Sequence, residues 1–331
     1  MDALSLALSS VRMTGAIFVD AICTAPWGFS VPPMERVAHL LAPGTERLVG
    51  YHLVTHGKAV IGLESSPDIP ITAGEIVIFP HGDPHRVGNG SPTELIDSGA
   101  SVGKWLQGDL TPMRVGGGGE MTRFVCGYFG CERHAARLFL SGLPPCIKMN
   151  VRGDGAGEWL QNTVLLLLSD TASQRPGRTA MLAKMAEALF IETLRRYMEM
   201  LPDEQMGWLG GARDAVVGAA LALLHAKPCQ NWTLAELAAA AGTSKSVLTE
   251  RFVRFLGEPP LKYLARWHLQ LAARKLQTTQ QTIINVAAEV GYESEAAFNR
   301  AFKREFGMPP ARYRKNLVAH GDGVAQRRGA G

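Results

Sequence analysis

The first half of the chain alternates short apolar runs with turns rich in Gly and Pro. Runs of β type cover Arg47 to Leu53, Lys58 to Leu63 and Glu75 to Phe79, with turn residues between them. Short runs at this spacing are typical of the strands of an all-β domain. The pattern therefore predicts a small β domain over residues 1–150.

From Glu158 the apolar positions change to helical spacing and form two groups. They are Trp159, Leu160, Thr163, Val164 and Leu167, then Met181, Leu182, Met185, Leu189, Ile191, Leu194 and Tyr197. Residues three or four apart share a helix face, so residues 151–211 are expected to hold two amphipathic helices that end in a linker. Such a pair usually packs a core, and between two domains it can also form a dimer interface.

The last hundred residues contain one helix-turn-helix pattern twice. In the first copy, a short helix from Leu234 to Ala238 is followed by Gly242 and a second helix from Ser244 to Val253. In the second copy, Gly291 makes the turn and Ser294 suits the N-cap of the following helix. Between the copies, Leu261 to Leu276 has the spacing of one long amphipathic helix. Two second helices held about 34 Å apart could enter successive major grooves of DNA.

Charge is divided unevenly along the chain. Residues 212–318 carry 15 Lys and Arg against 8 Asp and Glu, whereas the rest carries 19 against 22. A basic C-terminal block suggests an anionic partner, most commonly nucleic acid, although many basic domains bind nothing charged. A length of 331 residues favours two domains, and 46% hydrophobic content excludes wholesale disorder.

The C-terminal region resembles the AraC/XylS family of transcription regulators. The resemblance is carried by Ile283-x-x-Val286-Ala287-x-x-Val290-Gly291-Tyr292-x-Ser294-x-x-x-Phe298-x-x-x-Phe302-Lys303-x-x-Phe306-Gly307-x-x-Pro310-x-x-Tyr313-Arg314, and a similar stretch runs from Phe252 to Leu264. It covers about residues 212–316 and implies a helical domain with two helix-turn-helix units that binds double-stranded DNA.

By this resemblance, the exposed faces of the second helices contact DNA. Base edges are expected to meet Ser246, Thr249, Glu250, Glu295, Ala296, Asn299 and Arg300. Caps or phosphate contacts are expected from Ser244, Lys245, Arg251, Ser294, Lys303 and Arg304, and for each residue the alternative is a solvated helix face. Two features depart from the pattern: carboxylates stand at Glu250 and Glu295, and His268 stands where relatives often carry Arg.

The N-terminal half is similar to the cupin-type sensor domains found on this family. Gly74-x5-Pro80-x-Gly82-x2-His85-x3-Asn89 resembles the second cupin motif and implies that His85 faces the interior of a β-barrel. The first motif is degenerate, because His52 and His56 are four apart with Glu64 downstream. A role in metal binding stays open for His52, His56, His81 and His85, but for His85 a lining or structural role is favoured. No cofactor is expected, with a structural zinc ion as the alternative.

Three cysteines are candidate redox sensors: Cys23, Cys126 and Cys131. The opening residues, Cys23 before Pro26-Trp27, and Cys126-Gly127-Tyr128 are similar to an oxidant-responsive subgroup of these regulators. Sensing requires an accessible thiol with a lowered pKa. The alternatives are buried small side chains, or a partial zinc site in which Cys126-x4-Cys131-x2-His134 lacks a fourth ligand.

Together these features predict an α+β protein with a cupin-like β-barrel over residues 1–150, a helical linker and dimerisation segment over 151–211, an all-α DNA-binding domain over 212–316 and a flexible tail over 317–331. The expected function is a homodimeric regulator that responds to a small-molecule effector or an oxidant, with RNA polymerase as a further partner. One alternative is a regulator that binds an organic ligand in the barrel and has inert cysteines. A second is a cupin-fold enzyme, for which the sequence lacks an intact set of metal ligands.

The longest apolar run, Thr163 to Leu168, is far shorter than the roughly 18 residues of a membrane span, and no secretory signal is evident. A cytoplasmic location is therefore expected.

Overall fold

The computed structural model of the chain describes most of its residues. They are 1–9, 13–42, 47–64, 66–89, 95–102, 104, 111–131, 140, 142–152, 154–169, 176–202 and 204–315. The chain divides into two compact units, of which one is Arg12–Met200 and the other joins Met1–Val11 to Leu201–Gly331. The units therefore divide the chain at residue 200 rather than at the expected boundary at 150, and the helical segment belongs to the first unit. The expected tail over 317–331 lies outside the described residues.

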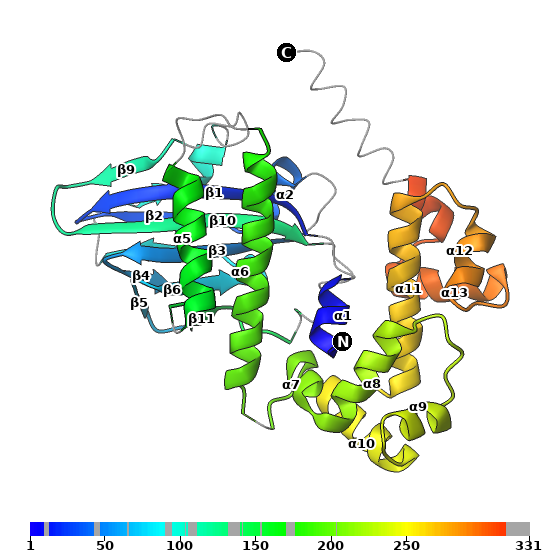
Figure 1. Cartoon of the computed structure of the whole chain (residues 1–331). Coiled ribbons are helices and arrows are strands. Elements are labelled where there is room, and N and C mark those ends of the chain that lie inside the picture. Colours follow the sequence, from blue (N-terminus) through cyan, green and yellow to red (C-terminus); the bar gives the residue numbers. More distant parts are fainter. Residues whose placement is uncertain are drawn as a thin grey trace. The chain divides into compact units, whose positions relative to one another are not determined.

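The unit Arg12–Met200 contains two β-sheets (Figure 1). The larger sheet has the order β11-β6-β3-β10-β1-β9, and the smaller has the order β5-β4-β7-β2-β8. The larger sheet consists of β1 (Met13–Thr24), β3 (Arg47–His56), β6 (Glu75–Phe79), β9 (Met113–Gly116), β10 (Met121–Cys131) and β11 (Ile147–Asn150). The smaller sheet consists of β2 (Gly28–Val31), β4 (Lys58–Gly62), β5 (Ile69–Thr72), β7 (His85–Gly88) and β8 (Ile96–Asp97). The three strands expected from the sequence are confirmed as β3, β4 and β6.

The core of this unit lies between the two sheets. Ala21, Val77 and Phe124 of the larger sheet and Phe29 and Ile61 of the smaller sheet belong to one buried cluster. Because side chains alternate between the two faces of a strand, these residues point to the inner faces of the two sheets. The interior of the barrel is therefore filled with side chains.

Glycine permits the tight turn between β5 and β6. Gly74 has a φ of 93°, in the left-handed region that side chains disfavour, and a Cβ there would lie 2.6 Å from the side chain of Arg152. This is the turn expected at the start of the cupin-like motif. In the chain, β6 and the bend after it lead directly to β7, the strand of the other sheet that begins with His85.

The described part of this unit also contains helices. They are α2 (Glu35–Leu41), α5 (Gly155–Ser169) and α6 (Arg178–Met200), with a 3-10 turn at Ser98–Ser101. Helix α6 packs against β1, β10 and β11, and α5 packs against α6 (Figure 1). The two amphipathic helices expected from the sequence are therefore present, and they cover the sheet of the first unit.

The second unit is helical (Figure 1). The helices whose bounds are described include α1 (Ala3–Ser9), α7 (Trp208–Arg213), α8 (Ala215–Ala226), α9 (Leu234–Ala240), α10 (Lys245–Leu256), α11 (Pro260–Thr278), α12 (Ile283–Glu289) and α13 (Glu295–Phe306). Both expected helix-turn-helix units and the long connecting helix are confirmed. In addition, α7 lies within the stretch expected to be a linker. No helix among the described residues is long and apolar enough to cross a membrane.

The N-terminal helix α1 packs on α8, more than 200 residues away in the sequence. Its buried face consists of Ala3, Leu4, Ala7 and Leu8, at the spacing of one helix face. The side chain of Asp2 accepts a hydrogen bond from the backbone N–H of Ser5 at 2.8 Å, which satisfies one of the free donors at the start of the helix. The first residues of the chain therefore belong to the helical unit, although the sequence pattern placed them in the β domain.

Candidate functional site

The first helix-turn-helix unit is formed by α9 and α10, and polar caps define both helix starts. Thr233 and Glu236 form a reciprocal capping box at the start of α9. The side chain of Ser244 accepts from the backbone N–H of Val247 and caps α10, as the sequence predicted. Leu248 and Phe252 are fully buried, so the side of α10 that bears them is held against the rest of the unit and the opposite side is left to solvent.

The second unit repeats this arrangement in α12 and α13. Ser294 caps α13 by accepting from the backbone N–H of Ala297, and Gly291 adopts a φ of 84° in the turn. Phe298 and Phe302 are fully buried in one cluster with residues of α11 and α12. The connecting helix α11 therefore contributes to the core of the second unit and fixes α13 against it.

The predicted DNA contacts all lie on α10, on α13 or at their N-caps, and none of them is buried. Eleven are exposed: Ser244, Lys245, Ser246, Glu250, Arg251, Ser294, Glu295, Ala296, Arg300, Lys303 and Arg304. Thr249 and Asn299 are half-buried. The fold thus leaves these side chains accessible to a nucleic acid.

Arg251 has a protein partner that the sequence did not suggest. Its guanidinium forms an ion pair with the carboxylate of Asp214, which is almost fully buried. The same carboxylate caps α8 by accepting from the backbone N–H groups of Val216 and Val217. Asp214 precedes a long apolar run, so an N-cap could have been recognised from the sequence, but its pairing with Arg251 depends on the packing of α10 near α8. A phosphate contact by Arg251 stays a prediction, and the ion pair gives this residue a structural role as well.

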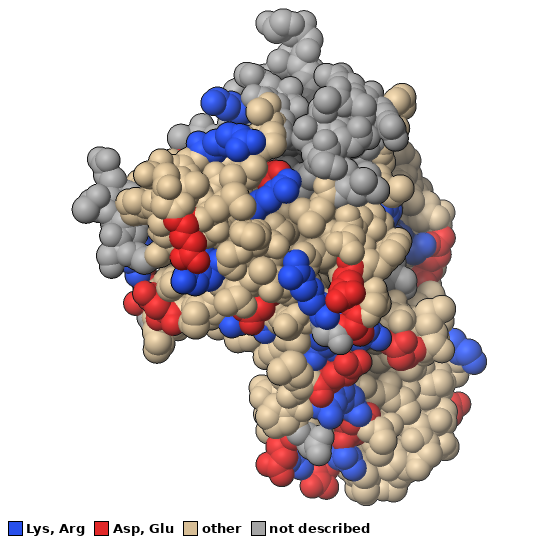
Figure 2. All heavy atoms as spheres, turned by 60° about the vertical axis from the view of Figure 1, so that its left-hand side comes forward, with Lys and Arg blue, Asp and Glu red and all other residues tan. Residues whose placement is uncertain are grey.

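Acidic and basic side chains are interspersed over the surface. Figure 2 shows red and blue atoms side by side on the face in view, without one large field of a single sign. Several pairs are close, including Arg266 with Glu258 at 2.7 Å and Arg196 with Asp154 at 2.7 Å.

In the other unit, His52 and His85 meet inside the barrel. Their Nε2 atoms are 2.8 Å apart, and both side chains are buried. The Nδ1 atom of His85 donates to the carbonyl oxygen of Asp83 at 2.9 Å, because a carbonyl can only accept. The Nε2 atom of neutral His85 is then an acceptor, and His52 Nε2 donates to it. The expectation that His85 faces the interior is confirmed.

Burial keeps both histidines neutral. Desolvation, followed by the neighbouring His85, lowers the pKa of His52 well below its usual value. Desolvation lowers the pKa of His85 to about 4, against a smaller opposing effect of the hydrogen bond to Asp83. The Nδ1 atom of His52 is buried without a hydrogen-bond partner, so a second proton there would be left unsatisfied.

The four candidate metal ligands are not brought together. His56 is exposed, and His81 Nε2 donates to the carbonyl oxygen of Leu143 at 2.9 Å. Among the described residues, no group of three His, Cys, Asp or Glu side chains is placed to hold a metal ion. A cupin metal centre needs at least three such ligands, so the donor set at His52 and His85 does not fit one.

Of the candidate sensor cysteines, Cys23 is buried and Cys126 is half-buried. Desolvation raises the pKa of Cys23 to about 12, and desolvation together with Cys23 raises the pKa of Cys126 to about 12. The Cys126 thiol donates to the carbonyl oxygen of Val19. These thiols lack the lowered pKa expected of a sensor. The backbone of Cys131 ends β10, whereas its side chain, like the whole of His134, lies outside the described residues.

Strand register separates Cys23 from Cys126. Cys126 on β10 pairs with Val19 on β1, and Cys23 lies four residues further along β1. Four residues of a strand span about 13 Å. A disulfide requires Cα atoms within roughly 7 Å, so these two cysteines cannot be bridged while β1 and β10 stay paired.

Comparison with known proteins identifies the family. A cupin family model matches residues 2–199, and a helix-turn-helix domain model matches residues 237–316. An AraC-like transcription regulator from Streptomyces lividans is 31% identical over 82% of this chain and 88% of its own length. The chain belongs to the AraC-like transcription regulators.

Two further relatives support this placement. An AraC-like transcription regulator from Streptomyces antibioticus is 38% identical over 60% of this chain, and the match spans 66% of that relative. The RCS-specific activator RclR from Escherichia coli is 25% identical over 96% of this chain and 98% of its own length. This AraC-like protein is therefore a DNA-binding transcription regulator and not an enzyme.

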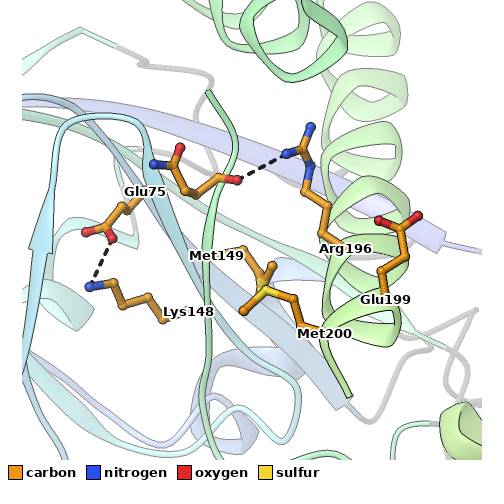
Figure 3. Close-up of a pocket in the computed structure, with 7 residues that line it drawn as sticks. Glu75, Lys148, Met149, Arg196, Glu199 and Met200 are labelled. Carbon is orange, nitrogen blue, oxygen red and sulfur yellow. Dashed lines mark hydrogen bonds and ion pairs between the residues drawn. The ribbon is translucent and has the colours of Figure 1, made fainter. Parts of the chain in front are cut away.

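A surface hollow of about 480 Å³ lies beside α6 in the cupin unit of this regulator (Figure 3). It is lined by Glu75, Lys148, Met149, Asn150, Arg196, Glu199 and Met200. Lys148 pairs with Glu75 at 3.0 Å, and Arg196 donates to the carbonyl oxygen of Asn150 at 3.4 Å. The cationic groups are thus already paired, and Figure 3 shows the two methionine side chains close together between them. No sequence pattern marks this hollow, because its residues come from separate elements.

Proposed function

We propose that this AraC-like regulator binds a bipartite DNA site, with α10 and α13 contacting bases in successive major grooves. The observation that carries the proposal is the repeated arrangement of a Ser-capped helix with one buried and one exposed face, joined by the single helix α11. Arg300 suits the edge of guanine and Asn299 the edge of adenine. Lys303 and Arg304 lie further along α13, where they suit phosphates.

The first experiment is a salt titration of binding between the full chain and duplex DNA selected from a random-sequence pool. We expect a steep fall in affinity with salt, since each phosphate contact releases counterions. Arg300→Ala is expected to cost about 1–3 kcal/mol and to relax preference at one base pair, whereas Lys303→Ala should weaken all duplexes alike and reduce the salt slope by about 1. Failure to enrich any duplex, or equal effects of the two variants, would contradict the proposal.

The signal is received in the cupin unit, and oxidation of its thiols is the first candidate. The likeness to the RCS-specific activator of Escherichia coli supports an oxidant signal. The raised pKa values of Cys23 and Cys126 leave little thiolate at neutral pH, so a strongly electrophilic oxidant is required and a weak peroxide reacts slowly. Each thiol would become a sulfenic acid as the oxidant accepts two electrons. A polar group in the buried cluster around Cys23 would then disturb the packing between the sheets.

DNA affinity before and after oxidant treatment tests this candidate. We expect Cys23→Ser or Cys126→Ser to abolish the change in affinity caused by a strong oxidant. Cys146→Ser is the matched control, because this half-buried cysteine lies in the same unit, is not among the candidate sensors and should leave the response intact. A response that survives in the Cys23→Ser, Cys126→Ser double variant would exclude these thiols.

A small organic effector is the second candidate, and the hollow beside α6 is the place that favours it. The barrel interior is filled by side chains, whereas this hollow is open and combines paired charges with the thioethers of Met149 and Met200. Amphiphilic ligands would suit such a lining. A thermal shift caused by an amphiphile and lost in Met149→Gln, with no dependence on thiol state, would support this candidate over the oxidant.

We also propose that the regulator acts as a homodimer through the exposed apolar side chains of α5 and α6. Trp159 is 60% exposed, Met181 is 50% exposed, and the nearby Ile191 is 36% exposed. Exposed aromatic side chains of this kind are typical anchors of protein interfaces. RNA polymerase remains a further partner that the family resemblance implies.

A further inference from the structure

The loop between α8 and α9 is hydrogen-bonded to the connecting helix through His268. The Nε2 atom of His268 donates to the carbonyl oxygen of Pro228 at 2.5 Å. Pro228 lies in residues 227–232, which lead directly into the first helix-turn-helix unit. The loop has bonds of its own, since Trp232 Nε1 donates to the carbonyl oxygen of Lys227 at 3.3 Å. A folded loop is therefore pinned to α11.

The same imidazole ring also touches the second helix-turn-helix unit. A Cβ atom added at Gly291 would lie 3.4 Å from Cε1 and 3.6 Å from Nδ1 of His268. Gly291 is the turn residue between α12 and α13, with a φ of 84°. The ring thus lies between the loop of the first unit and the turn of the second, close enough for a Cβ at Gly291 to meet it in van der Waals contact.

A second link lies beside the first. The thiol of Cys229 donates to the carbonyl oxygen of Glu289, the last residue of α12. The carboxylate of Glu289 in turn accepts from Lys275 of α11 and from Gln281 at 2.8 Å. Loop 227–232, α11 and the end of α12 are therefore joined at one junction, and the two recognition helices follow shortly after it in each unit (Figure 1).

His268 is directed at this junction and away from a role as a cationic phosphate ligand. Its single donating nitrogen is occupied by Pro228, and the ring is half-buried. The short ring stays between the two units. We propose that His268 is a positioning residue that fixes the separation and angle of α10 and α13, and so determines which half-site spacing the regulator accepts in DNA. The inference rests on the proposed bipartite binding.

Rigid spacing has a measurable consequence. One base pair inserted between two half-sites shifts them by about 3.4 Å and turns them by about 34°. A pair of recognition helices held at a fixed separation cannot follow this change without distortion of the protein or the DNA. If α11 were the only connection between the two recognition helices, their separation could adjust to the altered spacing, and affinity for the original site would be somewhat lower.

The experiment uses the full-length protein and the duplex that the wild type enriches from a random-sequence pool, with one base pair inserted or removed between the half-sites. We expect the wild type to lose about tenfold or more in affinity on either change. His268→Ala should bind the original duplex about fivefold more weakly, as expected for a lost hydrogen bond, and should lose less than about threefold on insertion. His268→Gln should resemble the wild type, because its amide Nε2 can donate to Pro228 in the same way.

His56→Ala is the matched control, since this exposed histidine lies in the cupin unit, and it should leave the spacing profile unchanged. A His268→Ala profile parallel to that of the wild type would overturn the proposal. If circular dichroism shows that His268→Ala does not fold, Cys229→Ala is tested in its place. A smaller loss of affinity on insertion than in the wild type would support the proposal, and an unchanged loss would overturn it. If the wild type enriches no duplex, bipartite DNA binding itself is contradicted. This result is obtained before any variant is tested, so the two failures are distinguishable.

Discussion

His85 lies in a place where protonation is unfavourable, and this links the stability of the cupin unit to pH. An unfolded histidine takes up a proton near pH 6.5, whereas burial holds the pKa of His85 at about 4. Between these two values the unfolded chain binds more protons than the folded chain. The free energy of unfolding therefore falls as the pH drops from about 6.5 towards 4, and the pKa of His52 is shifted in the same direction.

We predict that His85→Gln weakens this pH dependence. Each buried histidine contributes up to about 1.4 kcal/mol of destabilisation per pH unit in that window. The variant should be less stable than the wild type at pH 7.5 and should lose less on acidification to pH 5.0, as measured by urea unfolding. His56→Gln removes an exposed histidine and should retain the wild-type pH dependence. If the free energy of unfolding fell equally steeply with pH in His85→Gln and in the wild type, the conclusion that the buried histidines are neutral would be wrong.

At the scale of elements, the helices α5 and α6 differ in how much of their surface is covered. The inner face of α6 buries Ala186, Leu189, Phe190 and Leu194 in its own unit. Trp159 of α5 remains more than half exposed. Apolar positions at helical spacing predicted both helices, but the sequence did not say which side of each would remain uncovered.

We predict that Trp159→Glu weakens dimerisation, because a carboxylate replaces an aromatic anchor at the interface. The dissociation constant measured by sedimentation should rise about tenfold or more, in the range of interface hot spots. Ile284→Glu is the control, since Ile284 is 56% exposed on α12 of the helical unit. A regulator that is monomeric as wild type, or a dimer equally affected by both variants, would contradict an interface on α5 and α6.

At the scale of the whole molecule, the N-terminal and C-terminal segments of the chain both belong to the helical unit. Met1–Val11 and Leu201–Gly331 form one unit, and Arg12–Met200 forms the other. The polypeptide therefore passes between the units twice, just before β1 and just after α6. Strand β1, which carries Cys23, therefore follows within a few residues the helix that packs on α8.

We predict that α1 stabilises the helical unit. Leu8→Ala removes a side chain that is 6% exposed against α7 and α8, and a buried leucine of this kind contributes about 2–5 kcal/mol. The thermal midpoint of the helical unit should fall, and amide exchange in α8 should become faster. Leu6→Ala, at a half-buried position of the same helix, should have a smaller effect. Unchanged exchange in α8 would show that α1 contributes nothing to the unit.

The sequence by itself determined the local elements and the family. Periodicity located β3, β6 and both amphipathic helices, and Ser244 and Ser294 marked the starts of α10 and α13, because caps and apolar faces depend on neighbours within a few residues. The predicted DNA contacts were found on exposed helix faces for the same reason. The inward direction of His85 also followed from a local motif.

Only the tertiary structure decided the contacts between distant segments. The packing of α1 on α8, the pairing of Arg251 with Asp214 and the junction at His268 each join residues far apart in the chain, and no local pattern encodes their distance. The neutral state of His52 and the raised pKa of Cys126 likewise depend on burial by other strands. Local spacing fixes which face of an element is apolar, whereas packing fixes what that face meets and how far water is excluded from it.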